Sequence, residues 1–133
     1  MFLVDQILNA LGIRAFSKDL EKFKSILYEE NQRLNLTRVP ESDFYIRHLL
    51  DSLLLFPFLK FLTSKLKAQN ILDFGTGGGF PGVPLALAMP EVCFHLYDKS
   101  AKKRQYLFRL IEKLGVENLT VVETPSLLSL IHI

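Results

Sequence analysis

The segment that most restricts the fold is Ile71–Ala88, which reads "ILDFGTGGGFPGVPLALA". It places a dense run of glycines between an apolar triplet and an apolar helical pattern. Glycine weakens the interiors of both strands and helices, so this composition predicts a backbone that turns tightly or approaches a ligand closely. Because the glycines follow a strand and open a helix, the loop is expected at the carboxyl end of a parallel strand, where such sheets bind their ligands.

The second half of the chain predicts alternating strands and helices. Strands are expected at Asn70–Phe74, Val92–Tyr97 and Leu119–Glu123, and helices at Gly82–Met89 and Ala101–Leu114. This order is typical of a right-handed βαβαβ unit with a parallel sheet, so the fold class is α/β.

The first half of the chain predicts helices. Apolar residues at helical spacing indicate one helix over Phe2–Leu11, a second beginning near Ser17, and a third region over Glu41–Leu62 in which Pro57 should cause a break. We therefore expect a helical region over residues 1–69 and a partial Rossmann-like domain over residues 70–133, together forming one compact unit.

Composition limits the class of protein only loosely. The 133 residues are 49% hydrophobic and carry a formal charge of +2, which suits one folded domain and does not itself indicate a nucleic-acid partner. The single cysteine, Cys93, is expected to be a small buried residue; it excludes an intrachain disulfide and favours a reducing cytoplasm. No apolar run approaches about 18 residues, so no membrane span is expected.

An acidic residue stands where a ribose-binding group would be expected. Asp98 ends the second predicted strand, 21 residues after Gly77. A carboxylate at this position can accept hydrogen bonds from both hydroxyls of a ribose. The alternative is that Asp98 caps the helix that follows.

Two cofactors fit the glycine loop. The pattern Gly77-x-Gly79-x-x-Gly82 matches a dinucleotide fingerprint, which leaves a nicotinamide-dependent oxidoreductase as one reading. The pattern that starts at Asp73 and continues through Gly75 instead suits S-adenosylmethionine (SAM). An acid at the loop entrance would attract the cationic sulfonium and repel a pyrophosphate, which favours SAM.

Four stretches together resemble one protein family. They are "NLT" at Asn35–Thr37, "RHLLDSL" at Arg47–Leu53, "LDFGTGGGFPGVPLA" at Leu72–Ala86 and "LYDKSAKKRQYL" at Leu96–Leu107. In this order and spacing they resemble the RsmG (GidB) family of bacterial small-subunit ribosomal RNA methyltransferases, from about Glu30 to Glu123. The resemblance implies an enzyme of the class I SAM-dependent methyltransferase fold that methylates N7 of a guanine in 16S ribosomal RNA.

The resemblance also implies roles for individual residues. Arg47, His48 and Asp51 would lie on a helix near the cofactor mouth as catalytic candidates, with Arg47–Asp51 and His48–Ser52 as i,i+4 neighbours. The alternative is a hydrogen-bonded cluster that joins the helices to the sheet. No metal ligands are expected. The residues expected to bind SAM are Gly75, Thr76, Gly77, Gly79, Phe80, Asp98, Ser126 and Leu127.

The chemistry needs no general base, because guanine N7 carries no proton. Catalysis would depend on positioning and electrostatics, and the RNA must be held. The densest basic run contains Arg109 and the RNA-binding candidates Lys99, Lys102, Lys103 and Arg104. Contact with phosphates of 16S ribosomal RNA, free or in the small-subunit particle, is one reading. A solvated helix face is the other.

The likeness ends at Glu123, after which the chain reads "TPSLLSLIHI". This change predicts a truncated or frameshifted product, and leaves a SAM- or RNA-binding fragment without turnover as an alternative function. It would also leave the edge of the first strand open. We therefore expect Leu127–Ile133 to cover exposed apolar surface, or the chains to self-associate through that edge.

Overall fold

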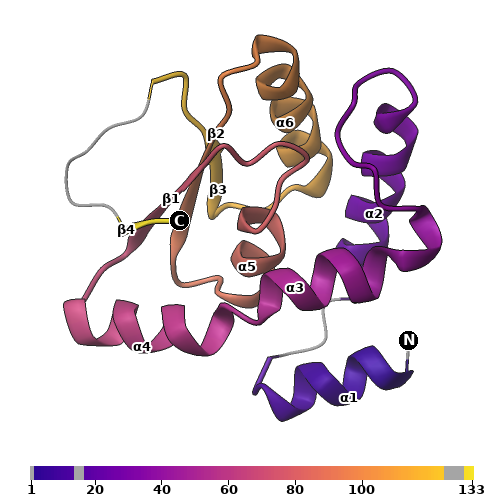
Figure 1. Cartoon of the computed structure of the whole chain (residues 1–133). Coiled ribbons are helices and arrows are strands. Elements are labelled where there is room, and N and C mark those ends of the chain that lie inside the picture. Colours follow the sequence, from indigo (N-terminus) through magenta and orange to yellow (C-terminus); the bar gives the residue numbers. More distant parts are fainter. Residues whose placement is uncertain (1, 14–16, 125–130) are drawn as a thin grey trace.

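The computed structural model describes residues 2–13, 17–124 and 131–133. Figure 1 shows a small central sheet with helices packed against it. Helices α5 and α6 contact strands β2 and β3, and helices α2 and α3 pack in turn against α6 and α5. Helices α2 and α3 thus form an outer layer on the same side as α5 and α6.

The elements follow one another in the order that the sequence predicts, except for differences in the third helical region and one further strand, β4, that was not predicted. The helices are α1 (Phe2–Ala10), α2 (Ser17–Asn31), a 3₁₀ turn η1 (Glu41–Asp43), a π-helix η2 (Phe44–Leu50), α3 (Asp51–Leu53), α4 (Phe56–Leu66), α5 (Gly82–Ala88) and α6 (Ala101–Leu114). The strands are β1 (Asn70–Phe74), β2 (Cys93–Tyr97), β3 (Leu119–Val121) and β4 (Ile131–His132).

All pairs in the sheet are parallel, in the order β3-β2-β1-β4. Phe74 is paired with Tyr97 at the last residues of β1 and β2. The carboxyl ends of these two strands therefore lie side by side, as a parallel α/β unit requires.

Strand β4 occupies the edge that the sequence predicts to be open. Ile71 pairs with Ile131, and the Ile133 amide donates to the Leu72 carbonyl at 2.8 Å. The prediction that the tail covers exposed surface is confirmed for residues 131–133. With that edge paired, the described residues give no support to the alternative of self-association.

The region Glu41–Leu62 is not one helix. It contains η1, η2, α3 and α4, and Pro57 lies in the first turn of α4, where its missing N–H costs nothing. The expected break at Pro57 is confirmed. Helix α4 continues to Leu66, beyond the predicted end, and Lys67 stops it in a left-handed conformation with φ of 52°.

Burial alternates along β2, and this overturns the prediction for Cys93. Phe94 and Leu96 are fully buried against the helices, so their neighbours Cys93 and His95 face the opposite side of the sheet. Cys93 is exposed rather than buried. His95 has a structural role, since its ring forms hydrogen bonds with the side chains of Asn70 and Thr120 at 2.9 Å each.

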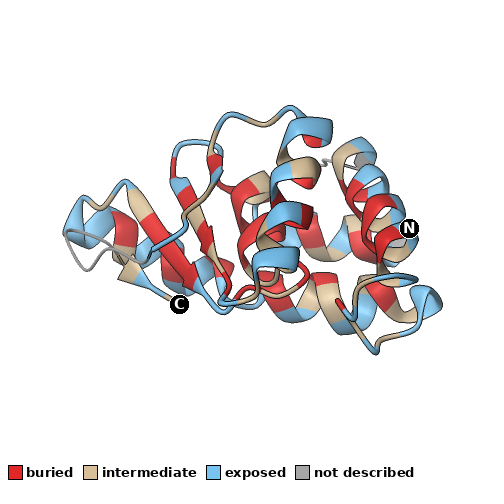
Figure 2. Ribbon diagram, turned by 90° about the horizontal axis from the view of Figure 1, so that it is seen from above, coloured by how far each residue is buried: buried red, intermediate tan, exposed pale blue. Residues whose placement is uncertain are grey.

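One hydrophobic core joins both halves of the chain. It contains Phe23, Phe44 and Leu49 from the helical region and Val83 and Phe94 from the sheet region. Figure 2 shows the buried residues concentrated between the sheet and the helices. The division at residues 69 and 70 stays a prediction.

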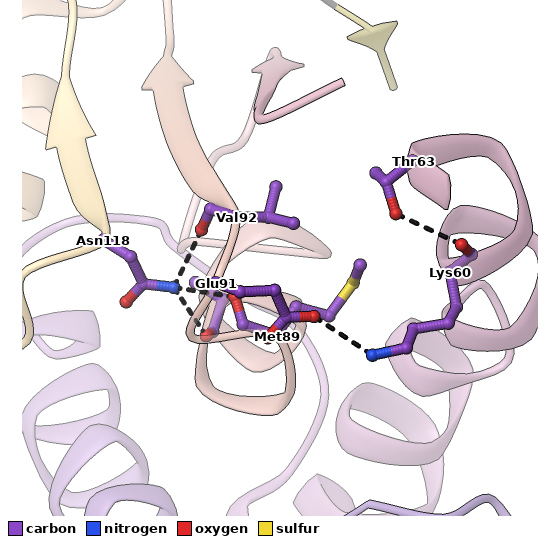
Figure 3. A network of polar contacts seen from close by, with 7 residues as sticks. Lys60, Thr63, Met89, Glu91, Val92 and Asn118 are labelled. Atoms are coloured by element: carbon purple, nitrogen blue, oxygen red, sulfur yellow. Dashed lines mark hydrogen bonds and ion pairs between the residues drawn. The ribbon is translucent and has the colours of Figure 1, made fainter. Parts of the chain in front are cut away.

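A polar network locks the amino ends of the strands (Figure 3). The Asn118 side-chain amide donates to the carbonyls of Ala86, Met89 and Val92 at 2.8, 3.1 and 3.0 Å. Lys60 of α4 bonds Glu91 at 3.1 Å. These contacts fasten the connection between α5 and β2 to both β3 and α4. Within the described residues, no helix has the length and hydropathy that crossing a membrane requires.

Candidate cofactor and acceptor site

The glycine loop turns sharply at the carboxyl end of β1. Gly75, Gly77 and Gly79 all have positive φ angles, of 77°, 57° and 111°. Gly78 has a different reason to be glycine, because an added Cβ would lie 3.0 Å from the Leu27 side chain and 3.3 Å from the Leu36 carbonyl oxygen. The fold itself thus explains much of the glycine content. Beside Gly75 and Gly77 an added Cβ would meet open space.

Asp73 lies beneath the loop rather than at its entrance. Its side chain is 2% exposed, and one carboxylate oxygen accepts bonds from the Thr76 hydroxyl at 2.6 Å and the Gly82 amide at 2.9 Å. The expectation that Asp73 faces a cationic cofactor is therefore wrong. Its carboxylate instead accepts a hydrogen bond from the Gly82 amide at the start of α5. A dinucleotide pyrophosphate would need that amide free.

Burial gives Asp73 an unusual titration. It raises the pKa of the Asp73 carboxyl from 3.8 to about 6, although the bonds from Thr76 and Gly82 act in the opposite direction. Between these pH values the folded protein retains a proton that the unfolded chain has released. The contribution of Asp73 to stability is therefore largest at low pH and declines as the pH rises toward 6.

This titration predicts a pH-dependent difference between the wild type and Asp73→Asn. The free energy of unfolding of the wild type, relative to the variant, should fall by about 2 kcal/mol between about pH 4 and pH 6, because the neutral amide does not titrate. Urea unfolding at several pH values measures this difference. A constant difference across that range would show that Asp73 titrates normally.

Asp98 joins the end of β2 to the loop. It is 7% exposed; one carboxylate oxygen accepts from the Gly77 amide at 3.0 Å and the other from the Ser100 amide at 3.0 Å. The residue that caps α6 is Ser100, whose hydroxyl accepts from the Lys103 amide, so the reading of Asp98 as the cap is wrong. A carboxylate has about four acceptor positions, so Asp98 keeps capacity for two hydroxyl donors.

The helical region meets the loop through stacked rings. His48 lies flat on Phe80, with 4.0 Å between ring centroids and 4° between planes, and its Nε2 is 2.6 Å from the Thr37 hydroxyl. Phe80 also contacts Phe23 and Phe44. Burial, with help from Arg47, lowers the pKa of His48, so the ring is neutral at physiological pH.

Arg47 and Asp51 are not brought together as predicted. Arg47 pairs with Asp43 at 3.5 Å, and both side chains are largely exposed. Arg47, which lies in the π-helix Phe44–Leu50, thus pairs with the aspartate four residues before it rather than with the one four residues after it. Of the three catalytic candidates, His48 alone is shown in contact with a residue of the cofactor loop region.

The basic run on α6 divides into exposed and engaged side chains. Lys99 and Lys102 are exposed. Arg104 donates to the carbonyls of Asp98 and Lys99 at 2.8 and 3.0 Å, so it braces the turn that carries Asp98. Arg109 holds Glu30 of α2 through two bonds, of 2.6 and 3.2 Å, and is not part of an open basic face. Lys103 is half-buried.

Two contacts at the loop lie beyond what sequence reasoning predicts. The Tyr106 hydroxyl, fully buried, donates to the Gly78 carbonyl at 2.8 Å, and Leu36 packs on the same glycine. Tyr106 reads in the sequence as one more apolar residue of α6, and nothing local marks its hydroxyl. Ser126 and Leu127, expected beside the adenine, lie outside the described residues.

The fold is the α/β arrangement of class I SAM-dependent methyltransferases, in part. A solved structure from Klebsiella pneumoniae, assigned as an O-methyltransferase, superposes with a TM-score of 0.54 at 21% identity, over 92% of this chain and 50% of its own. The parallel sheet, the glycine loop after β1 and the acidic end of β2 lie in the order that defines this class.

Sequence comparison identifies the family. The model for rRNA small subunit methyltransferase G matches residues 17–125. The ribosomal RNA small subunit methyltransferase G of Coxiella burnetii is 37% identical over 122 residues, covering 89% of this chain and 56% of its own length. That of Mesoplasma florum is 43% identical over 101 residues, covering 75% of this chain and 40% of its own. The chain belongs to this family and spans about half the length of these curated relatives.

Family membership favours one of the two cofactor classes, that of the methyltransferases. The dinucleotide reading depends on Gly77, Gly79 and Gly82 alone, whereas the Gly82 amide is already bonded to Asp73. Neither the family nor the geometry of the loop supports the oxidoreductase alternative.

Proposed function

We propose that this chain forms the SAM-binding part of an enzyme that methylates N7 of a guanine in 16S ribosomal RNA. Family membership supports the reaction class. The observation that carries the cofactor assignment is the Asp98 carboxylate, 3.0 Å from the Gly77 amide and beside the open space at Gly75 and Gly77. In this arrangement a ribose reaches the carboxylate while the loop backbone lies along the rest of the molecule.

The residues of the site act by binding and positioning. SAM supplies an activated methyl group when bound. Asp98 accepts the ribose hydroxyls, and Gly75, Thr76, Gly77 and Gly79 shape the backbone around the cofactor. Phe80, fixed between His48 and the aromatic core, limits the movement of the loop. Since N7 offers a free lone pair, no side chain needs to remove a proton.

The RNA partner is proposed to be 16S ribosomal RNA, free or within the small-subunit particle, in the cytoplasm. Lys99 and Lys102 lie exposed near the end of β2 that carries Asp98, where they suit phosphate contacts, and Lys103 follows them on α6.

Calorimetric titration tests the cofactor assignment. Saturable binding of SAM, with none of NAD, is the expected result for the 133-residue chain. Binding of NAD in preference to SAM, or of neither, would contradict the proposal. Transfer of a radiolabelled methyl group from SAM to small-subunit particles then tests the reaction itself.

Binding without turnover is the second candidate function. The described sheet has four strands, one of them only two residues long, and the structural neighbour superposes over half of its length. SAM binding with no methyl transfer, either to free 16S ribosomal RNA or to small-subunit particles, would favour this candidate over the first.

A further inference from the structure

The motif Asn35–Thr37 has no role in the cofactor site, yet it lies directly against the glycine loop. Leu36 contacts Gly78 so closely that a side chain there would meet its carbonyl oxygen. Asn31 fixes the shape of this segment: its side chain accepts from the Leu36 and Thr37 amides at 2.9 Å each and donates to the Thr37 carbonyl at 3.0 Å. The segment is therefore held rigidly against the loop.

A polar hollow of about 410 Å³ opens in this segment, lined by Asn35, Leu36, Thr37 and Arg38. This volume is within the range of small-ligand sites. The side chains of Asn35 and Arg38 are exposed, and neither has a hydrogen-bond or ion-pair partner among the residues that the structure describes. An amide with both donors and an acceptor free, beside a free guanidinium, suits a ligand that carries a hydrogen-bonding edge and a phosphate.

An aromatic surface adjoins the hollow through Thr37. The Thr37 hydroxyl accepts from the Val39 amide at 3.0 Å and lies 2.6 Å from His48 Nε2. This hydrogen bond between the Thr37 hydroxyl and His48 Nε2 fixes the ring in the plane that stacks on Phe80. A fixed, uncharged ring that is half-buried offers the kind of surface on which unstacked bases pack.

We propose that the hollow at Asn35–Arg38 receives the acceptor base, a purine extruded from single-stranded RNA. The inference rests on the proposed function and adds the site of its substrate. A guanine that turns N7 toward the cofactor presents its Watson–Crick edge on the opposite side. The Asn35 amide is free to bond that edge, Arg38 to bond the phosphate, and His48 to limit the base from one side.

Nuclear magnetic resonance of the ¹⁵N-labelled chain, titrated with a short single-stranded guanosine oligonucleotide, tests this assignment. Saturable shifts are expected at the amides of Asn35–Arg38 and at His48, with a weaker response to a cytidine oligonucleotide. Asn35→Ala should weaken guanosine binding roughly fivefold or more, the loss expected for one base contact. Because Asn35 is exposed, this variant leaves the fold intact.

Gln32→Ala is the matched control, since Gln32 is an exposed amide on the same connection but outside the hollow. It should bind the oligonucleotide as the wild type does. Equal affinities of Asn35→Ala and the wild type, or shifts restricted to Lys99–Arg104, would overturn the proposal. Shifts at Asn35–Arg38 caused by SAM rather than by the oligonucleotide would assign the hollow to the cofactor and overturn it as well. A separate SAM titration tests the proposed function by itself, so that its failure is distinguished from failure of the base-binding proposal.

Discussion

Replacing Asp98 with asparagine is expected to weaken SAM binding about a hundredfold. A hydrogen bond to a charged group is worth about 1.5–3 kcal/mol, and the carboxylate is proposed to make two such bonds to the ribose while it accepts from Gly77 and Ser100. An asparagine has one acceptor oxygen, so it cannot serve the loop, the turn and the ribose together. A loss of about 3 kcal/mol corresponds to roughly a hundredfold in affinity.

Calorimetry on the wild type and on two variants measures this effect. Asp43→Asn is the control, because it also removes one aspartate charge, from a largely exposed residue that pairs with Arg47. The control should bind SAM with wild-type affinity. If Asp98→Asn binds SAM as tightly as the control, the ribose is held elsewhere and the cofactor site is wrongly assigned.

Gly82→Ala is expected to destabilise the protein by about 3 kcal/mol, against the direction that helix propensity predicts. Gly82 is the first residue of α5, where alanine would ordinarily be favoured by up to about 1 kcal/mol. However, the added Cβ would collide with the Leu96 side chain and lie 2.7 Å from Asp73 Oδ2. Both neighbours are buried, so the substitution overpacks the core and displaces a buried carboxylate from its amide partner.

Urea unfolding of Gly82→Ala and of Gly115→Ala compares the free energy lost to a steric collision with the free energy lost to backbone strain. Gly115 ends α6 with φ of 67° and has open space where a Cβ would lie, so alanine there meets strain alone and should cost about 1 kcal/mol. A loss at Gly82 no larger than that at Gly115 would show that β1, β2 and α5 adjust easily around the loop.

The sequence predicts the sheet half of the chain well because its signals are local. The bounds of β1 and α6 are those expected, since a short apolar run ahead of the glycines and an amphipathic repeat ended by Gly115 leave little ambiguity. The meeting of Asp98 with Gly77 also follows from sequence, because carboxyl ends of neighbouring parallel strands share one edge.

Features that depend on how the helices dock could not be predicted. The pairing of Glu30 with Arg109 joins residues 79 apart and requires α2 to cross α6 at one particular place. The π-helix at Phe44–Leu50 has no local signature, and spacing alone does not decide whether Arg47 pairs with Asp43 or with Asp51, which lie four residues to either side of it. The expectation that Asp73 faces the cofactor from the loop entrance is wrong because the alternation within β1 does not reveal that the start of α5 covers its carboxylate.

The hydrogen bonds of the Asn118 side-chain amide restrict which substitutions the fold tolerates at this position. Its two hydrogens serve three carbonyls, so at least one hydrogen is shared, and no shorter or acidic side chain reproduces that arrangement. This fastening is at the amino ends of the strands, while the glycine loop and Asp98 lie at the carboxyl ends. A substitution of Asn118 would therefore loosen the sheet at the end opposite the proposed cofactor site, without removing any residue that is proposed to bind SAM.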